Sequence, residues 1–139
     1  MTNKASKILL ISTDSDPIRV LREAMDKGQI LPFELIHVED VFTAQDVLEK
    51  NEIYLIILDL SVSQEHGLEQ LDQLCKEASG IPILVLIDPE DDSLGIQAIK
   101  RGAHEYFSKR KALTNVRSLI DSIRYTLEKQ ILLGNAMSL

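Results

Sequence analysis

The stretch Tyr54-Leu55-Ile56-Ile57-Leu58-Asp59 decides the fold, because a continuous apolar run ends abruptly in a carboxylate. Apolar residues without polar alternation predict a strand buried on both faces, as in a parallel sheet that helices cover. Such a strand delivers Asp59 to the carboxyl edge of the sheet, where open parallel sheets bind their ligands. By position alone, Asp59 fits a functional carboxylate and a turn former or helix cap equally well.

Strand and helix patterns alternate along the rest of the chain. Apolar runs predict four further strands, over residues 8–11, 33–38, 83–87 and 105–107. Asp16 and Pro17 predict the N-cap and the first residue of a helix. Apolar residues at helical spacing predict further helices over residues 44–48, from the Gly67 region, over residues 94–99, and from about residues 112–115 past Glu128. This alternation predicts an α/β fold with a parallel sheet covered on both faces.

Composition narrows the class of protein. The chain has 139 residues, of which 45% are apolar and 27% are charged, as expected for one ordinary globular domain. A formal net charge of -7 argues against nucleic-acid binding by this domain alone. The single cysteine excludes a disulfide framework within the chain. The sequence has no bilayer-spanning apolar run and no secretory signal, so we expect no membrane contact and a cytoplasmic location.

The C-terminal residues need a separate account. We expect residues 1–130 to form the domain, and residues 131–139 to be a C-terminal tail or the start of a linker to a further domain. The last predicted helix carries Val116, Ile120, Ile123 and Leu127 at helical spacing. That pattern is explained by packing on the sheet, but its continuation could form a coiled coil or pair with a second copy.

Polar residues follow several of the predicted strands. The carboxyl ends of parallel strands meet at one edge of the sheet. The residues expected at this edge, including the apolar Ile87, are Ser12, Thr13, Asp14, Asp59, Ile87 and Lys109. A lysine near an aspartate favours the ionised carboxylate, which could then act as a nucleophile while the ammonium holds an incoming oxyanion. The alternative for Lys109 is a solvated lysine in the run Ser108-Lys109-Arg110-Lys111.

Over about residues 7–129 the chain resembles the receiver domain of two-component response regulators. The segments that carry the resemblance are Lys7-Ile8-Leu9-Leu10-Ile11, Tyr54-Leu55-Ile56-Ile57-Leu58-Asp59-Leu60 with Gly67 eight residues after the aspartate, Ile81-Pro82-Ile83-Leu84-Val85-Leu86, and Ala98-Ile99-Lys100-Arg101-Gly102-Ala103-His104-Glu105-Tyr106-Phe107-Ser108-Lys109. Each segment alone is weak evidence, whereas all of them in order and at family spacing are strong evidence.

The resemblance implies a flavodoxin-like (βα)5 fold, a doubly wound five-stranded parallel sheet with strand order 2-1-3-4-5. It implies that Asp59 accepts a phosphoryl group from a histidine kinase or phosphotransfer protein, beside Mg²⁺. Lys109 would contact the phosphoryl oxygens, and Tyr106 would be the aromatic switch residue. The face of the fourth helix and fifth strand would change its affinity for a partner. Apart from the resemblance, a homodimer could form through that face or through the C-terminal helix.

The chain departs from the family pattern at several positions. The family has two acidic metal ligands after the first strand, where this chain has Ser12 and Thr13. The family has Ser or Thr at the end of the fourth strand, where this chain has Ile87, which offers no hydrogen bond. Proline is usual four residues after the phosphoacceptor, and here that residue is Ser63.

These departures weaken the expected metal site. Mg²⁺ in proteins is typically held by one or two carboxylates together with waters and phosphate oxygens. Asp59 with the hydroxyls of Ser12 and Thr13 would bind Mg²⁺ poorly, and Asp14 could compensate only as a weak ligand. A turn residue before Asp16-Pro17 is the favoured interpretation of Asp14. Tyr106 is also explained as a half-buried strand aromatic, and Asp88 as a loop acid or helix cap.

Three functions remain open from the sequence. The first is a working receiver phosphorylated on Asp59, which at most catalyses its own phosphoryl transfer and hydrolysis. The second is a pseudo-receiver, which keeps the fold as a protein-interaction or dimerisation module without phosphorylation. The third is a flavodoxin-like flavin binder. It is disfavoured because the loop after the first strand lacks glycine and carries aspartates where a phosphate would lie.

Overall fold

The structure is a computed structural model, and it describes residues 6–28, 33–60, 66–87 and 92–137, with side chains from residue 7 up to residue 130. The predictions for Ser63 and Asp88 fall outside the described residues. In the described part of the chain, no helix is both long and apolar enough to cross a membrane.

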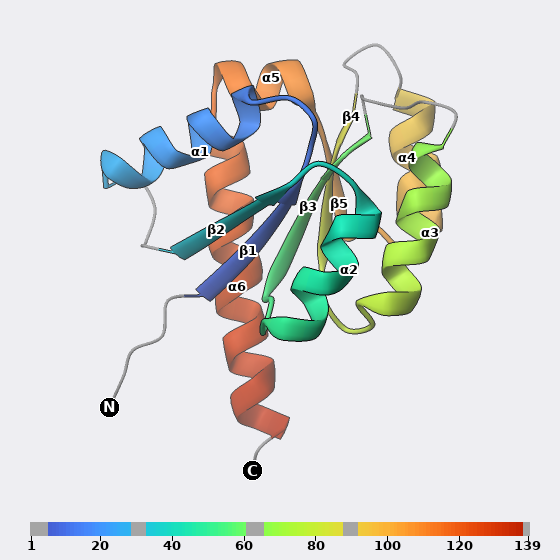
Figure 1. Cartoon of the computed structure of the whole chain (residues 1–139). Coiled ribbons are helices and arrows are strands. Elements are labelled where there is room, and N and C mark those ends of the chain that lie inside the picture. The colour runs from blue at the N-terminus through green and yellow to red at the C-terminus, as the bar shows by residue number, and fades with distance from the viewer. Residues whose placement is uncertain (1–5, 29–32, 61–65, 88–91, 138–139) are drawn as a thin grey trace.

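Five parallel strands form one sheet in the order β2-β1-β3-β4-β5 (Figure 1). The strands are β1 Ser6–Ile11, β2 Phe33–Val38, β3 Leu55–Asp59, β4 Ile83–Ile87 and β5 Glu105–Ser108. Every residue of β3 and β4 is buried, whereas β5 is half-buried at one edge of the sheet. The structure therefore confirms the predicted five-stranded doubly wound fold and the predicted edge position of the fifth strand.

Six helices connect or follow the strands in the described residues. They are α1 Asp16–Asp26, α2 Val41–Lys50, α3 Gly67–Glu77, α4 Asp92–Lys100, α5 Lys109–Thr114 and α6 Arg117–Met137. In Figure 1, α1, α5 and α6 lie on one side of the sheet and α2, α3 and α4 on the other. Two buried apolar clusters agree with this, because residues of β1, β3 and β4 alternate between them.

The first helix begins one residue earlier than predicted. Asp16 and Pro17 were expected to be the N-cap and the first helical residue, but α1 starts at Asp16. The reason is that Asp14 Oδ1 accepts the Asp16 N–H at 3.0 Å, so Asp14 satisfies a backbone donor at this terminus. The turn role predicted for Asp14 is therefore confirmed.

The last predicted helix is two helices, and Lys109 lies inside the first of them. Helix α5 begins directly after β5, with Ser108 as N-cap whose side chain accepts the Lys111 N–H. Asn115 is extended, with φ -131° and ψ 90°, and separates α5 from α6. The prediction that the helix begins near residues 112–115 was thus wrong at its start, because the cap at Ser108 adds a short helix.

The backbone of α6 continues past the domain boundary expected at residue 130. The core side chains of this helix, Leu119, Ile120 and Ile123, all precede that boundary. The helix nevertheless extends to Met137, beyond the end of the sheet in Figure 1. The division into residues 1–130 and 131–139 stays a prediction.

Candidate functional site

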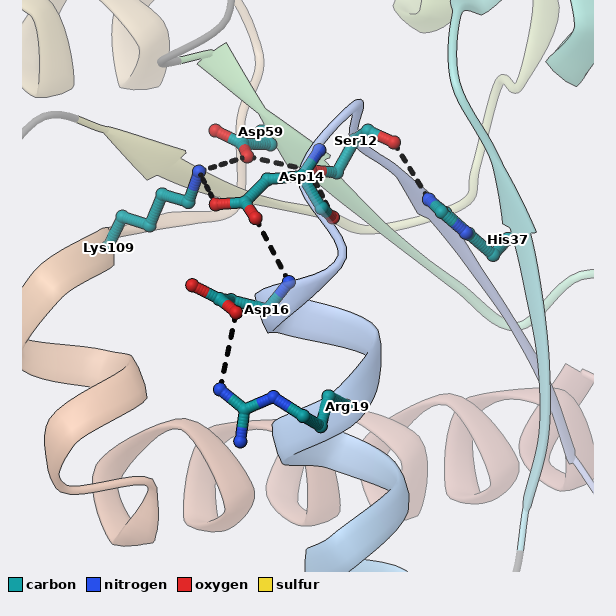
Figure 2. A network of polar contacts seen from close by, with 7 residues as sticks. All are labelled: Ser12, Asp14, Asp16, Arg19, His37, Asp59 and Lys109. Atoms are coloured by element: carbon teal, nitrogen blue, oxygen red, sulfur yellow. Dashed lines mark hydrogen bonds and ion pairs between the residues drawn. The ribbon is translucent and has the colours of Figure 1, made fainter.

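An ion-pair cluster lies at the carboxyl edge of the sheet. Lys109 Nζ, at the start of α5, lies 2.8 Å from Asp59 Oδ2 and 2.8 Å from Asp14 Oδ2. The Asp59 side chain has no exposed surface, that of Lys109 is 15% exposed and that of Asp14 is 37% exposed. Figure 2 shows the ammonium between the two carboxylates. The predicted pairing of an aspartate and a lysine from different strand ends is thus present.

Ser12 completes the contacts of Asp59 that Figure 2 draws. Its Oγ donates to Asp59 Oδ2 at 2.8 Å and accepts the Asp14 N–H at 3.0 Å. Ser12 is 1% exposed, so this hydroxyl is withdrawn from solvent. One oxygen of Asp59 therefore receives both a neutral O–H donor and an ammonium.

The electrostatics of Lys109 and Asp14 follow from this geometry. Partial burial works to lower the pKa of Lys109, but the hydrogen bonds and charges of Asp14 and Asp59 outweigh it and raise the pKa above its usual value. The hydrogen bond from Lys109 and the backbone bond from Asp16 together hold the pKa of Asp14 below its usual range. Lys109 therefore stays charged and Asp14 stays ionised at neutral pH.

Asp14 has two roles that the sequence presented as alternatives. One carboxylate oxygen accepts the Asp16 N–H at the start of α1, and the other pairs with Lys109. A carboxylate has two oxygens with several lone pairs, so it can serve a turn and an ion pair together. The structure thus brings Asp14 into the site, although the sequence favoured the turn alone.

Thr13 and Ile87 lie differently from Ser12. Thr13 is exposed, and among the described contacts none joins it to Asp59 or Lys109. Ile87 is 1% exposed and belongs to the apolar cluster beneath α2, α3 and α4. It lies opposite Ser108 in the register of β4 and β5. At the end of β4 the site therefore has an apolar side chain without a hydrogen-bonding group.

Tyr106 is half-buried and packs against the same apolar cluster as Ile87. A β-carbon added to Gly95 of α4 would lie 2.5 Å from Tyr106 Cδ2, closer than carbon atoms approach one another. The tyrosine ring therefore lies directly against the α4 backbone. This position agrees with a half-buried strand aromatic, and the switch role stays a prediction.

The side chains as placed do not fit a bound Mg²⁺. Asp14 and Asp59 provide the two carboxylates that Mg²⁺ commonly uses, but both contact Lys109 Nζ. Within the described ranges, no group of three or more His, Cys, Asp or Glu side chains could hold a metal ion. A divalent cation between the two carboxylates would have to displace the ammonium from at least one of them.

Sequence reasoning missed the support that β2 gives to this edge. His37 Nε2 lies 2.7 Å from the carbonyl oxygen of Ser12, and the Ser12 N–H donates to the Val38 carbonyl at 3.0 Å. His37 lies in an ordinary strand pattern, so nothing in its sequence neighbourhood marks it. In the sequence, Ser12 stands where the family has an acidic residue, and its bond to Asp59 is visible only in the three-dimensional structure.

Comparison with protein families gives a match over most of the chain. The family described as the response regulator receiver domain matches residues 8–121, which include Ser12, Asp14, Asp59 and Lys109. Because the match is to a receiver domain, it favours the receiver interpretation over the flavin-binding alternative.

The curated relatives are longer proteins. The C4-dicarboxylate transport transcriptional regulatory protein DctD of Pseudomonas aeruginosa is 26% identical over 131 residues, which cover 94% of this chain and 27% of the relative. The sensory transduction protein LytR of Streptococcus agalactiae is 33% identical over 76 residues, covering 55% of this chain and 30% of the relative. The chain thus spans about a third or less of these two proteins.

Solved structures share the fold. A response regulator from Hahella chejuensis has a TM-score of 0.74 and 22% identity, over 88% of this chain and 95% of that chain. The signal receiver domain of an HD domain-containing protein from Pseudomonas fluorescens has a TM-score of 0.77 and 22% identity, over 97% and 96% of the two chains. At this identity the structures support the fold alone, and the family rests on the match over residues 8–121. Together with the (βα)5 sheet, this match shows that the chain belongs to the response regulator receiver domain family of two-component signalling.

Proposed function

We propose that this chain is a receiver module that accepts a phosphoryl group on Asp59 from a histidine kinase or phosphotransfer protein. The observation that carries the proposal is the pairing of the buried Asp59 with Lys109 at 2.8 Å at the carboxyl edge of the sheet. A carboxylate in that position can act as a nucleophile, and the ammonium can hold the incoming phosphoryl oxygens. The family provides the context of two-component signalling.

The proposed step transfers a phosphoryl group between two protein side chains. A carboxylate oxygen of Asp59 attacks the phosphorus of a phosphohistidine and forms a new P–O bond. The P–N bond breaks, its electron pair stays on the imidazole nitrogen, and that nitrogen takes up a proton from solvent. Positioning and charge neutralisation dominate such transfers. Lys109 is suited to the neutralisation because it already contacts Asp59 Oδ2.

Receiver domains in general bind Mg²⁺ at an acidic pocket. For this chain we expect weak binding through Asp59 and Asp14. Lys109 bridges both carboxylates, and its ammonium would have to leave at least one of them before a divalent cation enters. When bound, Mg²⁺ would neutralise phosphoryl charge.

The partner surface that we propose is the face formed by α4 and β5. Ile96 and Ile99 on α4 are 50% and 41% exposed, and Tyr106 of β5 is half-buried against this helix. Exposed apolar side chains on an otherwise acidic domain suit contact with another protein. We also propose that a homodimer forms through this face or through α6. The proposed location of the protein is the cytoplasm.

The output of the signal is also a proposal, because the chain spans a small part of its curated relatives. One of those relatives is named as a transcriptional regulatory protein. With a net charge of -7, this domain alone is unsuited to binding nucleic acid. We therefore expect any DNA-binding output to come from a different domain or partner.

The test is the intact mass of the protein after incubation with Mg²⁺ and acetyl phosphate, a small phosphodonor. We expect the wild-type chain to gain the mass of one phosphoryl group. The Asp59→Asn variant removes the nucleophilic carboxylate and keeps the shape of the side chain, so it should gain none. An equal gain in both proteins, or none in either, would contradict phosphorylation of Asp59.

A pseudo-receiver is the second candidate, and the contacts of Lys109 favour it. The ammonium is shared by Asp14 and Asp59, and Ile87 provides no hydrogen bond at the end of β4. In this alternative the ion-pair cluster only holds α5 against the sheet. The signalling output then depends on binding of a partner protein and not on phosphorylation. A chain that gains no phosphoryl mass, with or without Mg²⁺, would favour this candidate.

A further inference from the structure

The backbone of Ser12 is held beyond the end of β1 by contacts with β2. Its N–H donates to the Val38 carbonyl at 3.0 Å, and its own carbonyl oxygen lies 2.7 Å from His37 Nε2. Because a carbonyl oxygen only accepts, His37 Nε2 must carry the hydrogen of this bond. Two hydrogen bonds to a neighbouring strand thus fix the residue at the carboxyl edge of the sheet.

The side chain of Ser12 is equally constrained. Its Oγ accepts the Asp14 N–H at 3.0 Å and lies 2.8 Å from Asp59 Oδ2 and 3.3 Å from the Asp14 carbonyl oxygen. A hydroxyl has one hydrogen, and the contact at 2.8 Å to Asp59 is stronger than the contact at 3.3 Å to the Asp14 carbonyl. The O–H of Ser12 therefore points at Asp59, and the bond from Asp14 keeps it there.

Lys109 contacts the same oxygen of Asp59 but is less constrained. Its ammonium stands on a long side chain from α5 and, among the described residues, pairs with both Asp14 and Asp59. Ser12 is short, 1% exposed and bonded through its backbone and its side chain. Compared with Lys109, Ser12 is therefore better suited to fix the plane of the carboxylate.

We propose that Ser12 is a positioning residue for Asp59, whose hydroxyl fixes the orientation of the accepting carboxylate without adding charge. The proposal rests on the proposed function, in which Asp59 is the phosphoacceptor. A second carboxylate at this position would repel an anionic phosphoryl group unless a cation neutralised it. A neutral donor orients Asp59 without that repulsion.

The experiment compares phosphorylation rates of the full chain with acetyl phosphate as the probe, read by intact mass. Ser12→Ala removes the hydroxyl, Ser12→Cys keeps its approximate shape with a weak donor, and Ser12→Thr restores an O–H. Thr13→Ala is the matched control, because it removes a neighbouring hydroxyl that is exposed. The free energy of unfolding and the backbone amide spectrum, including the Asp14 N–H, are measured for each variant.

We expect Ser12→Ala and Ser12→Cys to lower the maximal rate roughly tenfold, which corresponds to about 1.4 kcal/mol. The half-saturating concentration of acetyl phosphate should stay unchanged, since the donor still binds. Ser12→Thr should recover most of the rate, and Thr13→Ala should match wild type. The Cys variant keeps the test decisive if Ser12→Ala fails to fold.

Two failures can be told apart. If wild type is phosphorylated and Ser12→Ala and Ser12→Cys react at the wild-type rate, the positioning role is wrong while the proposed function stands. If their loss of rate follows a general loss of stability and Thr does not rescue it, the role is structural and the proposal is also wrong. If wild type gains no phosphoryl group, the proposed function fails, and the positioning role fails with it.

Discussion

A single oxygen, Oδ2 of Asp59 at the end of β3, contacts side chains from the residue after β1 and from the first residue of α5. Ser12 and Lys109 both bond to it at 2.8 Å, and the Asp59 side chain has no exposed surface. A buried carboxylate is costly unless opposite charge and hydrogen bonds compensate for lost hydration. The free energy of unfolding should therefore depend on Lys109, and stability measurements can detect this dependence.

The first prediction concerns Lys109→Met, which keeps the length of the side chain and removes the charge. Asp59 then loses its cationic partner inside the protein, and we expect the free energy of unfolding to fall by about 3 kcal/mol. Urea unfolding followed by circular dichroism measures this change. The matched control is Lys111→Met on the same short helix, because Lys111 is exposed and forms no ion pair among the described residues.

A double variant separates the ion pair from packing. If the cost comes from the buried charge of Asp59, adding Asp59→Asn to Lys109→Met should recover most of the lost stability. If the loss of unfolding free energy in the double variant equals the sum of the losses in the two single variants, Asp59 and Lys109 do not interact energetically. That result would contradict the electrostatic account of the site.

The second prediction concerns acid. The hydrogen bond from Lys109 lowers the pKa of Asp14 in the folded state below the unfolded value of about 3.9. The stabilisation is therefore fully present above about pH 4 and is lost as the pH falls through the folded pKa. Asp14→Asn, which can still accept the Asp16 N–H, should flatten the decline of unfolding free energy below about pH 4.

The control for the acid experiment is Asp26→Asn, which removes an exposed carboxyl group that has no ion pair among the described residues. Urea unfolding at a series of pH values compares the three proteins. An Asp14→Asn curve parallel to wild type would show that the ion pair with Lys109 contributes nothing to acid stability.

At the scale of elements, the packing of β5 against α4 depends on Gly95. A glycine inside a helix usually costs about 0.5–1 kcal/mol relative to alanine. Here an added β-carbon would lie 2.5 Å from the Tyr106 ring, so the ring or the helix would have to move. The local contact therefore reverses the usual sign of a glycine-to-alanine change.

The third prediction is that Gly95→Ala destabilises the protein by about 1–2 kcal/mol and makes Tyr106 more accessible to solvent. Chemical unfolding gives the stability, and tyrosine fluorescence quenching gives the exposure. The comparison pair is Tyr106→Ala with and without Gly95→Ala. Once the ring is absent, alanine at position 95 should no longer be harmful, and a persisting cost would refute the ring contact as its cause.

The fourth prediction concerns α6. Its core residues precede residue 130, so a chain that ends there should keep its unfolding free energy to within about 0.5 kcal/mol. Analytical ultracentrifugation of both lengths tests the proposed role of the helix in pairing. Loss of cooperative unfolding in the shortened chain would place residues 131–137 inside the domain and would contradict the boundary at residue 130.

At the scale of the whole molecule, the strands and the architecture of the sheet could be predicted from the sequence, because the pattern of apolar residues determines them. Strands β3 and β4 are uniform apolar runs, and a doubly wound sheet then brings Asp59 and Lys109 to one edge. The start of α5 was not predictable, because Ser108 fits both the N-cap of a short helix, as observed, and an extended connection after β5. The bond between Ser12 and Asp59 spans 47 residues of sequence, so local patterns carry no signal for it.

The central claim is that Asp59 carries the phosphoryl group, and chemical trapping tests it most directly. An aspartyl phosphate is an acyl phosphate, which borohydride reduces, so peptide mass spectrometry after reduction identifies the residue that was modified. After reaction with acetyl phosphate and Mg²⁺, we predict the reduced residue at Asp59 and nowhere else in the chain. Reduction at another aspartate, or an unmodified Asp59 in a fully folded chain, would contradict the account.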